Sequence, residues 1–157
     1  MVAPPRNKFL VVADESPEFK SALRYCSRRA KNTGGVLVIL RVIEPADFQH
    51  WMSVGDIMRE EAREEAEALV QELVNMAFEW SEAMPEVVIR EGDAMEEILQ
   101  LIDEDPNIRI LVLGASIDKD GPGPLVSRLA GQVSGQLHEP LVVVPGAMTA
   151  EEIDTVT

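Results

Sequence analysis

Five short, mostly apolar runs, separated by segments with helical periodicity, constrain this chain more than any other feature. Most of the runs lack the polar–apolar alternation of a half-solvated strand, so we expect strands that are buried on both faces. The runs cover residues 8–13, 36–42, 86–91, 108–113 and 141–144. Strands that alternate with helices favour an α/β fold with a single open, mostly parallel five-stranded sheet and helices on both faces.

The segments between the runs predict four helices. Ser16 followed by Pro17 is typical of a helix start, and Gly34 with Gly35 is typical of a helix end. The other three helices are expected over residues 56–80, from Asp93 onward, and over 125–137. The helix over 56–80 is amphipathic, with glutamates on the face away from its apolar stripe.

The remaining C-terminal segment is acidic and shows no apolar period. We therefore predict one domain over residues 1–146, followed by a flexible acidic tail over 147–157.

Charge and cysteine content restrict the classes of function. The formal net charge of −14 over 157 residues argues against binding to nucleic acids or anionic membranes, because both need positive surface. The single cysteine, Cys26, allows no internal disulfide, and no apolar run approaches the ~20 residues of a membrane span. We expect a soluble, cytoplasmic protein.

The strand pattern also predicts where a ligand would bind. In open α/β sheets, ligands bind beyond the carboxyl ends of the strands, where the strand order reverses. That rule selects the loops after the first, second and fourth strands, which contain residues 14–16, 42–45 and 114–124.

The third of these loops is rich in glycine but poor in backbone donors. Gly121 and Gly123 can adopt positive φ and leave room for a phosphate. Pro122 and Pro124, however, lack an N–H, and the nearby aspartates add negative charge. A phosphate cradle and a simple turn both remain open, and a Mg²⁺ ion carried by a nucleotide would favour the cradle.

The ordered set of these features resembles the universal stress protein family over roughly residues 8–145. The resemblance rests on the first strand with Asp14-Glu15-Ser16, the second with Arg41-Val-Ile-Glu-Pro45, the long second helix, Glu91-Gly-Asp93, and the Gly121-x9-Gly131 spacing. It implies a strand order of 3-2-1-4-5 and an adenine-nucleotide-hydrolase-like fold. It also implies a homodimer joined through residues 141–144, an apolar edge strand that invites pairing with another chain.

The nucleotide-binding members of that family suggest the site residues. Asp14 and Val42 match positions near the ribose and the base, and Ser16 is either a helix cap or part of the same site. The glycine signature departs from the family's in two ways, because Gly114 stands too far before Gly121 and Gln132 replaces a serine or threonine. The cofactor-binding residues implied by the resemblance are Asp14, Ser16, Val42, Gly114, Gly121, Gly123, Gly131 and Gln132.

The resemblance thus predicts a regulatory or stress-survival module that binds ATP, with Mg²⁺, in a degenerate glycine-loop site and has at most weak ATP hydrolysis. No catalytic or metal-ligating residue is assigned. The alternatives are a dimeric interaction module without nucleotide and a nucleotidyl-transferring enzyme, although no histidine- or lysine-rich loop supports the latter. A phospho-accepting receiver domain is disfavoured, because no lysine follows the fifth strand.

Four other residues carry weaker signals. We expect Cys26 to pack in the core, and His50 and His138 to lie on the surface. Arg128 lies one turn after the glycines, where it faces either solvent or a phosphate.

Overall fold

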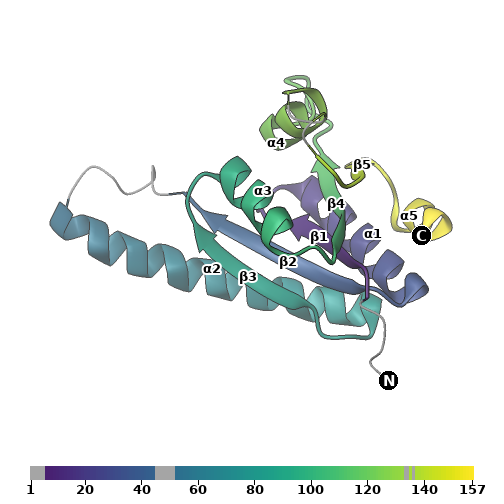
Figure 1. The fold of residues 1–157 in the computed structure, drawn as a ribbon, viewed down its shortest axis with the longest axis horizontal. Coiled ribbons are helices and arrows are strands. Elements are labelled where there is room, and N and C mark those ends of the chain that lie inside the picture. Colours follow the sequence, from purple (N-terminus) through teal and green to yellow (C-terminus); the bar gives the residue numbers. More distant parts are fainter. Residues whose placement is uncertain (1–5, 45–51, 133–134, 136) are drawn as a thin grey trace.

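A single parallel sheet organises the chain in the computed structural model, which describes residues 6–44, 52–132, 135 and 137–157. Its strands are β1 (Lys8–Val12), β2 (Val36–Ile43), β3 (Glu86–Glu91), β4 (Ile108–Ala115) and β5 (Leu141–Pro145). The order β3-β2-β1-β4-β5 confirms the prediction, and all four neighbouring pairs are parallel. The strand order reverses beside β1, which lies between β2 and β4, so the loops after these three strands leave the same edge of the sheet (Figure 1).

Helices cover both faces of this sheet. They are α1 (Pro17–Thr33), α2 (Met52–Ser81), α3 (Ala94–Glu104), α4 (Pro124–Ser127) and α5 (Ala150–Val156), with a π-helical turn, η2 (Arg128–Gln132), after α4. Phe9 and Val11 of β1 pack with α1 and α2, whereas Leu10 and Val12 pack with α3 and α4. The continuous apolar run in β1 is thereby explained, because alternate side chains enter two separate cores.

Helix α1 begins and ends at the predicted positions. Pro17 is its first residue and Ser16 its N-cap, while Gly34 at the C-cap takes a φ of +72° and donates to the carbonyls of Ala30 and Lys31. The side chain of Ser16 does not cap the helix, however, because its hydroxyl bonds the carboxylate of Asp14. Asp93 does cap α3, accepting the amide of Glu96 at 3.0 Å.

Two predictions about helices need correction. The fourth helix was expected over 125–137, but α4 ends at Ser127 and continues as the π-helical turn to Gln132. The expected flexible tail is wrong for residues 150–156, which form α5 with a capping box between Thr149 and Glu152. Ile153 is buried, and Asp154 binds Arg24 through two hydrogen bonds of 2.8 and 2.9 Å.

Candidate functional site

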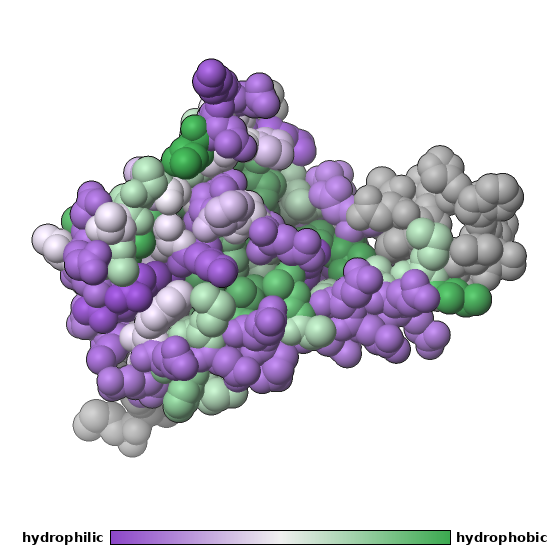
Figure 2. All heavy atoms as spheres, turned by 180° about the vertical axis from the view of Figure 1, so that it is seen from behind, coloured by the Kyte–Doolittle hydropathy of each residue, from purple (hydrophilic) through white to green (hydrophobic). Residues whose placement is uncertain are grey.

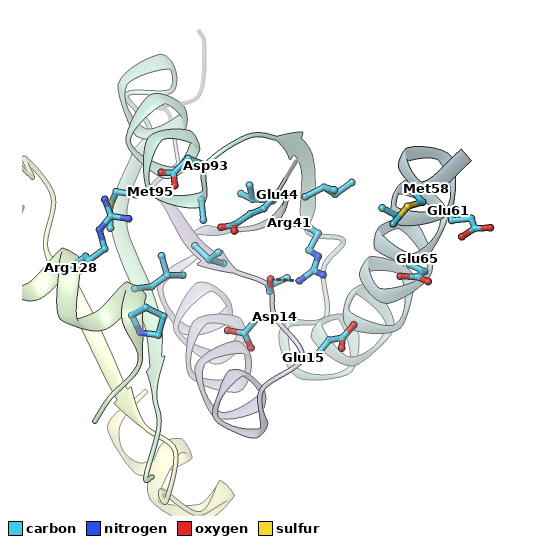
Figure 3. A pocket seen from close by; sticks show the side chains of 18 residues that line it. Asp14, Glu15, Arg41, Glu44, Met58, Glu61, Glu65, Asp93, Met95 and Arg128 are labelled. Atoms are coloured by element: carbon cyan, nitrogen blue, oxygen red, sulfur yellow. Dashed lines mark hydrogen bonds between the residues drawn. The ribbon is translucent and has the colours of Figure 1, made fainter. Parts of the chain in front are cut away.

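A cavity of about 580 Å³ lies at the carboxyl ends of β1 and β2, where the predicted loops converge. Its walls come from the ends of both strands, from α2, and from the first residues of α3 and α4 (Figure 3). This volume falls within the range of about 300–1,000 Å³ in which proteins bind small molecules. The strand-end rule therefore located the cavity from sequence.

The cavity combines apolar walls with a dense set of charges. The apolar lining comes from Val12, Ala13, Val42, Ile43, Met58, Ala62, Ala94, Met95, Pro124 and Leu125. Six carboxylates, Asp14, Glu15, Glu44, Glu61, Glu65 and Asp93, and two guanidinium groups, Arg41 and Arg128, complete it. Such walls suit a flat apolar ring that carries polar groups at its rim.

The loop after β1 directs two carboxylates to different parts of the site. The Oδ1 of Asp14 accepts the amide of Ser16 at 2.8 Å and also bonds the Ser16 hydroxyl, so the loop fixes this side chain. Figure 3 shows Glu15 turned toward α2 and Asp14 turned away from it. Ser16 lies in the neighbouring groove between α1 and α2, which Asp14 and Glu15 also line.

The two arginines lie on opposite walls of the cavity (Figure 3). Arg41, on β2, donates from Nη1 to the carbonyl oxygen of Ala13 at 3.2 Å, which fixes it beside the end of β1. Arg128, on the first turn of η2, is exposed, and among the described residues it has no ion-pair partner. Arg128 is thus the more exposed of the two cations, whereas the Nε of Arg41 is buried and has no hydrogen-bond partner among the described residues.

The predicted site residues divide into two groups. Asp14 and Val42 line the cavity, whereas Gly114, Gly121, Gly123 and Gly131 are not among the described residues that do. Gly121 and Gly123 take φ values of +105° and +107°, as expected for a tight glycine turn. The backbone of Gln132 ends η2.

Gly114 has a packing role in this structure. A Cβ at that position would lie 2.5 Å from the carbonyl oxygen of Glu18, so only glycine lets β4 approach the first turn of α1. A Cβ at Gly131, in contrast, would meet open space among the described residues outside its own helical turn.

Three side chains that sequence reasoning did not assign to the site also line it. Arg41 was quoted only as part of a strand, and Glu61 and Glu65 only as part of a solvated helix face. The sequence pointed indirectly to Arg41, since it directly precedes Val42. It did not point to Glu61 or Glu65, because the packing angle of α2 decides which of its residues reach the strand ends.

Other candidate groups lie away from the cavity. Cys26 is fully buried, and this burial raises the pKa of its thiol, which confirms its role in packing and makes it unreactive. His138 is exposed as expected, and His50 lies outside the described residues.

Among the described residues, no cluster of three or more acidic, histidine or cysteine side chains is placed to hold a metal ion. In the same part of the chain, no helix is long and apolar enough to cross a membrane.

Comparisons with known proteins agree with the fold. A model of the universal stress protein family matches residues 5–145. A search of curated proteins gave no match. Among solved structures, the universal stress protein UspA from Lactobacillus plantarum is 17% identical with a TM-score of 0.72, covering 90% of this chain and 99% of its own. The hypothetical protein MJ0577 is 17% identical with a TM-score of 0.75, covering 93% of this chain and 100% of its own.

A further solved relative was determined with a ligand. It is a universal stress protein in complex with cAMP, 17% identical with a TM-score of 0.57, covering 90% of this chain and 98% of its own.

Proposed function

This chain belongs to the universal stress protein family, and we propose that it is a cytoplasmic regulatory or stress-survival module that binds an adenine nucleotide. The observation that carries the proposal is the cavity at the strand ends, which brings Asp14 and Val42 together with apolar walls. The relative solved with cAMP supports a nucleotide as the class of ligand.

The lining suits a nucleoside. Met58, Met95 and Leu125 offer apolar surface to a base, and the main chain of Val42 at the end of β2 offers hydrogen-bonding groups to its edge. Asp14, fixed by Ser16, is placed to accept hydrogen bonds from ribose hydroxyls. We propose these residues as the base and ribose site.

ATP with Mg²⁺ is the ligand that the glycine loop suggests first. The described lining contains no histidine, lysine or cysteine, which favours binding over catalysis, so at most weak hydrolysis is expected.

Thermal unfolding tests the proposal. A nucleotide present at 100 times its Kd should stabilise the fold by about 2.7 kcal/mol, which raises Tm by several degrees. Ala62→Trp should remove this shift, because it fills the cavity from α2, whereas Ala68→Trp on the exposed side of the same helix should keep it. A wild-type Tm unmoved by millimolar adenine nucleotides would refute nucleotide binding and leave the interaction module as the better hypothesis.

We also propose a homodimer joined through β5. This strand forms an edge of the sheet, and Val143 on it is 37% exposed in the single chain. An exposed apolar edge strand favours pairing with another copy.

A further inference from the structure

The loop between β4 and α4 uses its own backbone donors internally. The amide of Ser116 donates to the carbonyl of Pro122 at 3.0 Å, and that of Gly121 to the carbonyl of Asp118 at 3.2 Å. The amide of Asp118 donates to Ser116 Oγ at 3.1 Å. Positions 122 and 124 are prolines and have no N–H to offer. A chain of phosphates needs several free amides, and in this loop three amides are already bonded and two positions have none.

The charge of the cavity opposes additional phosphates. A single phosphate carries about −1.5 to −2 at pH 7, and each further phosphate of a nucleotide adds charge beside the six carboxylates of the lining. Like charges within one cavity repel, and the repulsion grows with each added phosphate. Arg41 donates one N–H to the carbonyl of Ala13 and lies on the opposite wall, so Arg128 is the cation of the lining on the α4 side (Figure 3).

The position of Arg128 matches the needs of one phosphate. It lines the cavity beside Pro124 and Leu125, on the wall opposite Arg41 and the α2 glutamates (Figure 3). A guanidinium group can bind one phosphate through two parallel hydrogen bonds. The same group cannot also neutralise a second and a third phosphate.

Resting on the proposed nucleotide function, we infer that this site selects nucleoside monophosphates over triphosphates, with Arg128 as the phosphate-binding residue. The reduced set of loop amides and the six carboxylates of the lining disfavour the longer phosphate chain. The site therefore distinguishes nucleotides by their number of phosphates. The loop with the glycine signature does not bind a triphosphate in this chain.

Calorimetric titration of the full chain with adenosine, AMP, ADP, ATP and ATP with Mg²⁺ tests this inference. AMP should bind at least about tenfold more tightly than adenosine, because Arg128 contributes a charge-assisted contact. ATP should bind about tenfold or more weakly than AMP, with or without Mg²⁺. Raising the salt concentration should narrow the gap between AMP and ATP, because it screens the repulsion.

Paired variants identify the groups responsible. Arg128→Gln should reduce AMP affinity about tenfold, toward that of adenosine, and leave adenosine binding unchanged. Arg63→Gln is the matched control, since Arg63 carries the same charge on α2 but pairs with Glu67 at 3.5 Å and is not part of the lining. Glu61→Gln combined with Glu65→Gln should raise affinity for ATP more than for AMP.

Each outcome decides between the claims. ATP binding as tight as AMP, in either metal condition, overturns the monophosphate preference while keeping nucleotide binding. An equal loss of adenosine and AMP affinity in Arg128→Gln overturns its phosphate role. Failure of all four ligands to bind, with ATP tested both with and without Mg²⁺, overturns the proposed function and the monophosphate preference with it.

Discussion

At the scale of single residues, the glycines around the loop after β4 are not equivalent. Replacing Gly114 by alanine places a Cβ 2.5 Å from the backbone oxygen of Glu18, whereas alanine at Gly131 meets open space in a helical turn. We predict that Gly114→Ala destabilises the protein by about 1–3 kcal/mol through overpacking. Gly131→Ala should leave stability unchanged or raise it by up to about 1 kcal/mol. Urea unfolding measures both, and equal effects would contradict the packing role of Gly114.

The rule for strand ends selects the loops that contain Asp14 and Val42, and both residues line the cavity. Their contact with a nucleotide stays a prediction. The glycines were selected by spacing, but spacing does not reveal whether the amides of a loop are free or donate to carbonyls of the same loop, as those of Ser116 and Gly121 do. For Arg128 the sequence left two alternatives, a position facing solvent or one facing a phosphate. Its place in the cavity wall depends on where α4 changes to π-helical geometry.

At the scale of elements, α5 depends on ionic contacts with α1. Asp154 binds Arg24 and lies 2.9 Å from Arg28, and Asn32 donates to the carbonyl of Thr157 at 3.1 Å. The Arg24 guanidinium, as the main cause, lowers the pKa of Asp154 below its ordinary value of 3.8. The stabilisation by this carboxylate is therefore full above pH 3.8 and is lost as the pH falls through the lower pKa of the folded state.

Hydrogen exchange of residues 150–156 tests this dependence. We predict strong amide protection near pH 7 and its selective loss in acid, before the sheet unfolds. Asp154→Asn should weaken protection of α5 already at pH 7, whereas Asp118→Asn, the same charge change in the loop after β4, should not. Protection of α5 that is identical in wild type and Asp154→Asn would refute the ionic anchoring.

The outer face of α2 should contribute little to stability. Figure 2 shows hydrophilic side chains along the outlying part of this helix, and Glu64 and Glu67 are both exposed. Exchanging both for glutamine removes one exposed ion pair, between Glu67 and Arg63. This double change should alter the free energy of unfolding by about 0.5 kcal/mol or less. A loss several times larger in urea unfolding would show that this face is covered in solution.

Elements with their own sequence signal were predictable, and elements made by tertiary contacts were not. The strands and α1 to α3 carry apolar periods, caps or glycine ends that act locally. Helix α5 has a single buried apolar residue, Ile153, and is positioned by arginines more than a hundred residues earlier in the chain. A window of sequence around 150–156 cannot show those partners, and its one local signal, the capping box of Thr149 and Glu152, was not recognised in the sequence.

At the scale of the whole molecule, the sheet has two edges, and they differ in their surroundings. On the edge strand β3, Val87 is 41% exposed, but the strand also begins and ends with a glutamate, Glu86 and Glu91. Strand β5 consists of apolar residues from Leu141 to Pro145 and carries no charge. Charged residues on an edge discourage pairing with other chains, so β5 is the edge expected to form the dimer.

Sedimentation velocity of two matched edge variants tests the proposed dimer. Val143→Glu places like charges on both copies at the paired edge and should weaken dimerisation at least about tenfold. Val87→Glu makes the same change on the opposite edge and should leave the dimer intact. Because each chain carries a net charge of −14, association must overcome repulsion between the copies, so higher salt should strengthen the dimer. A wild-type monomer at tens of micromolar in high salt, or equal dissociation by both variants, would show that β5 does not join the two copies.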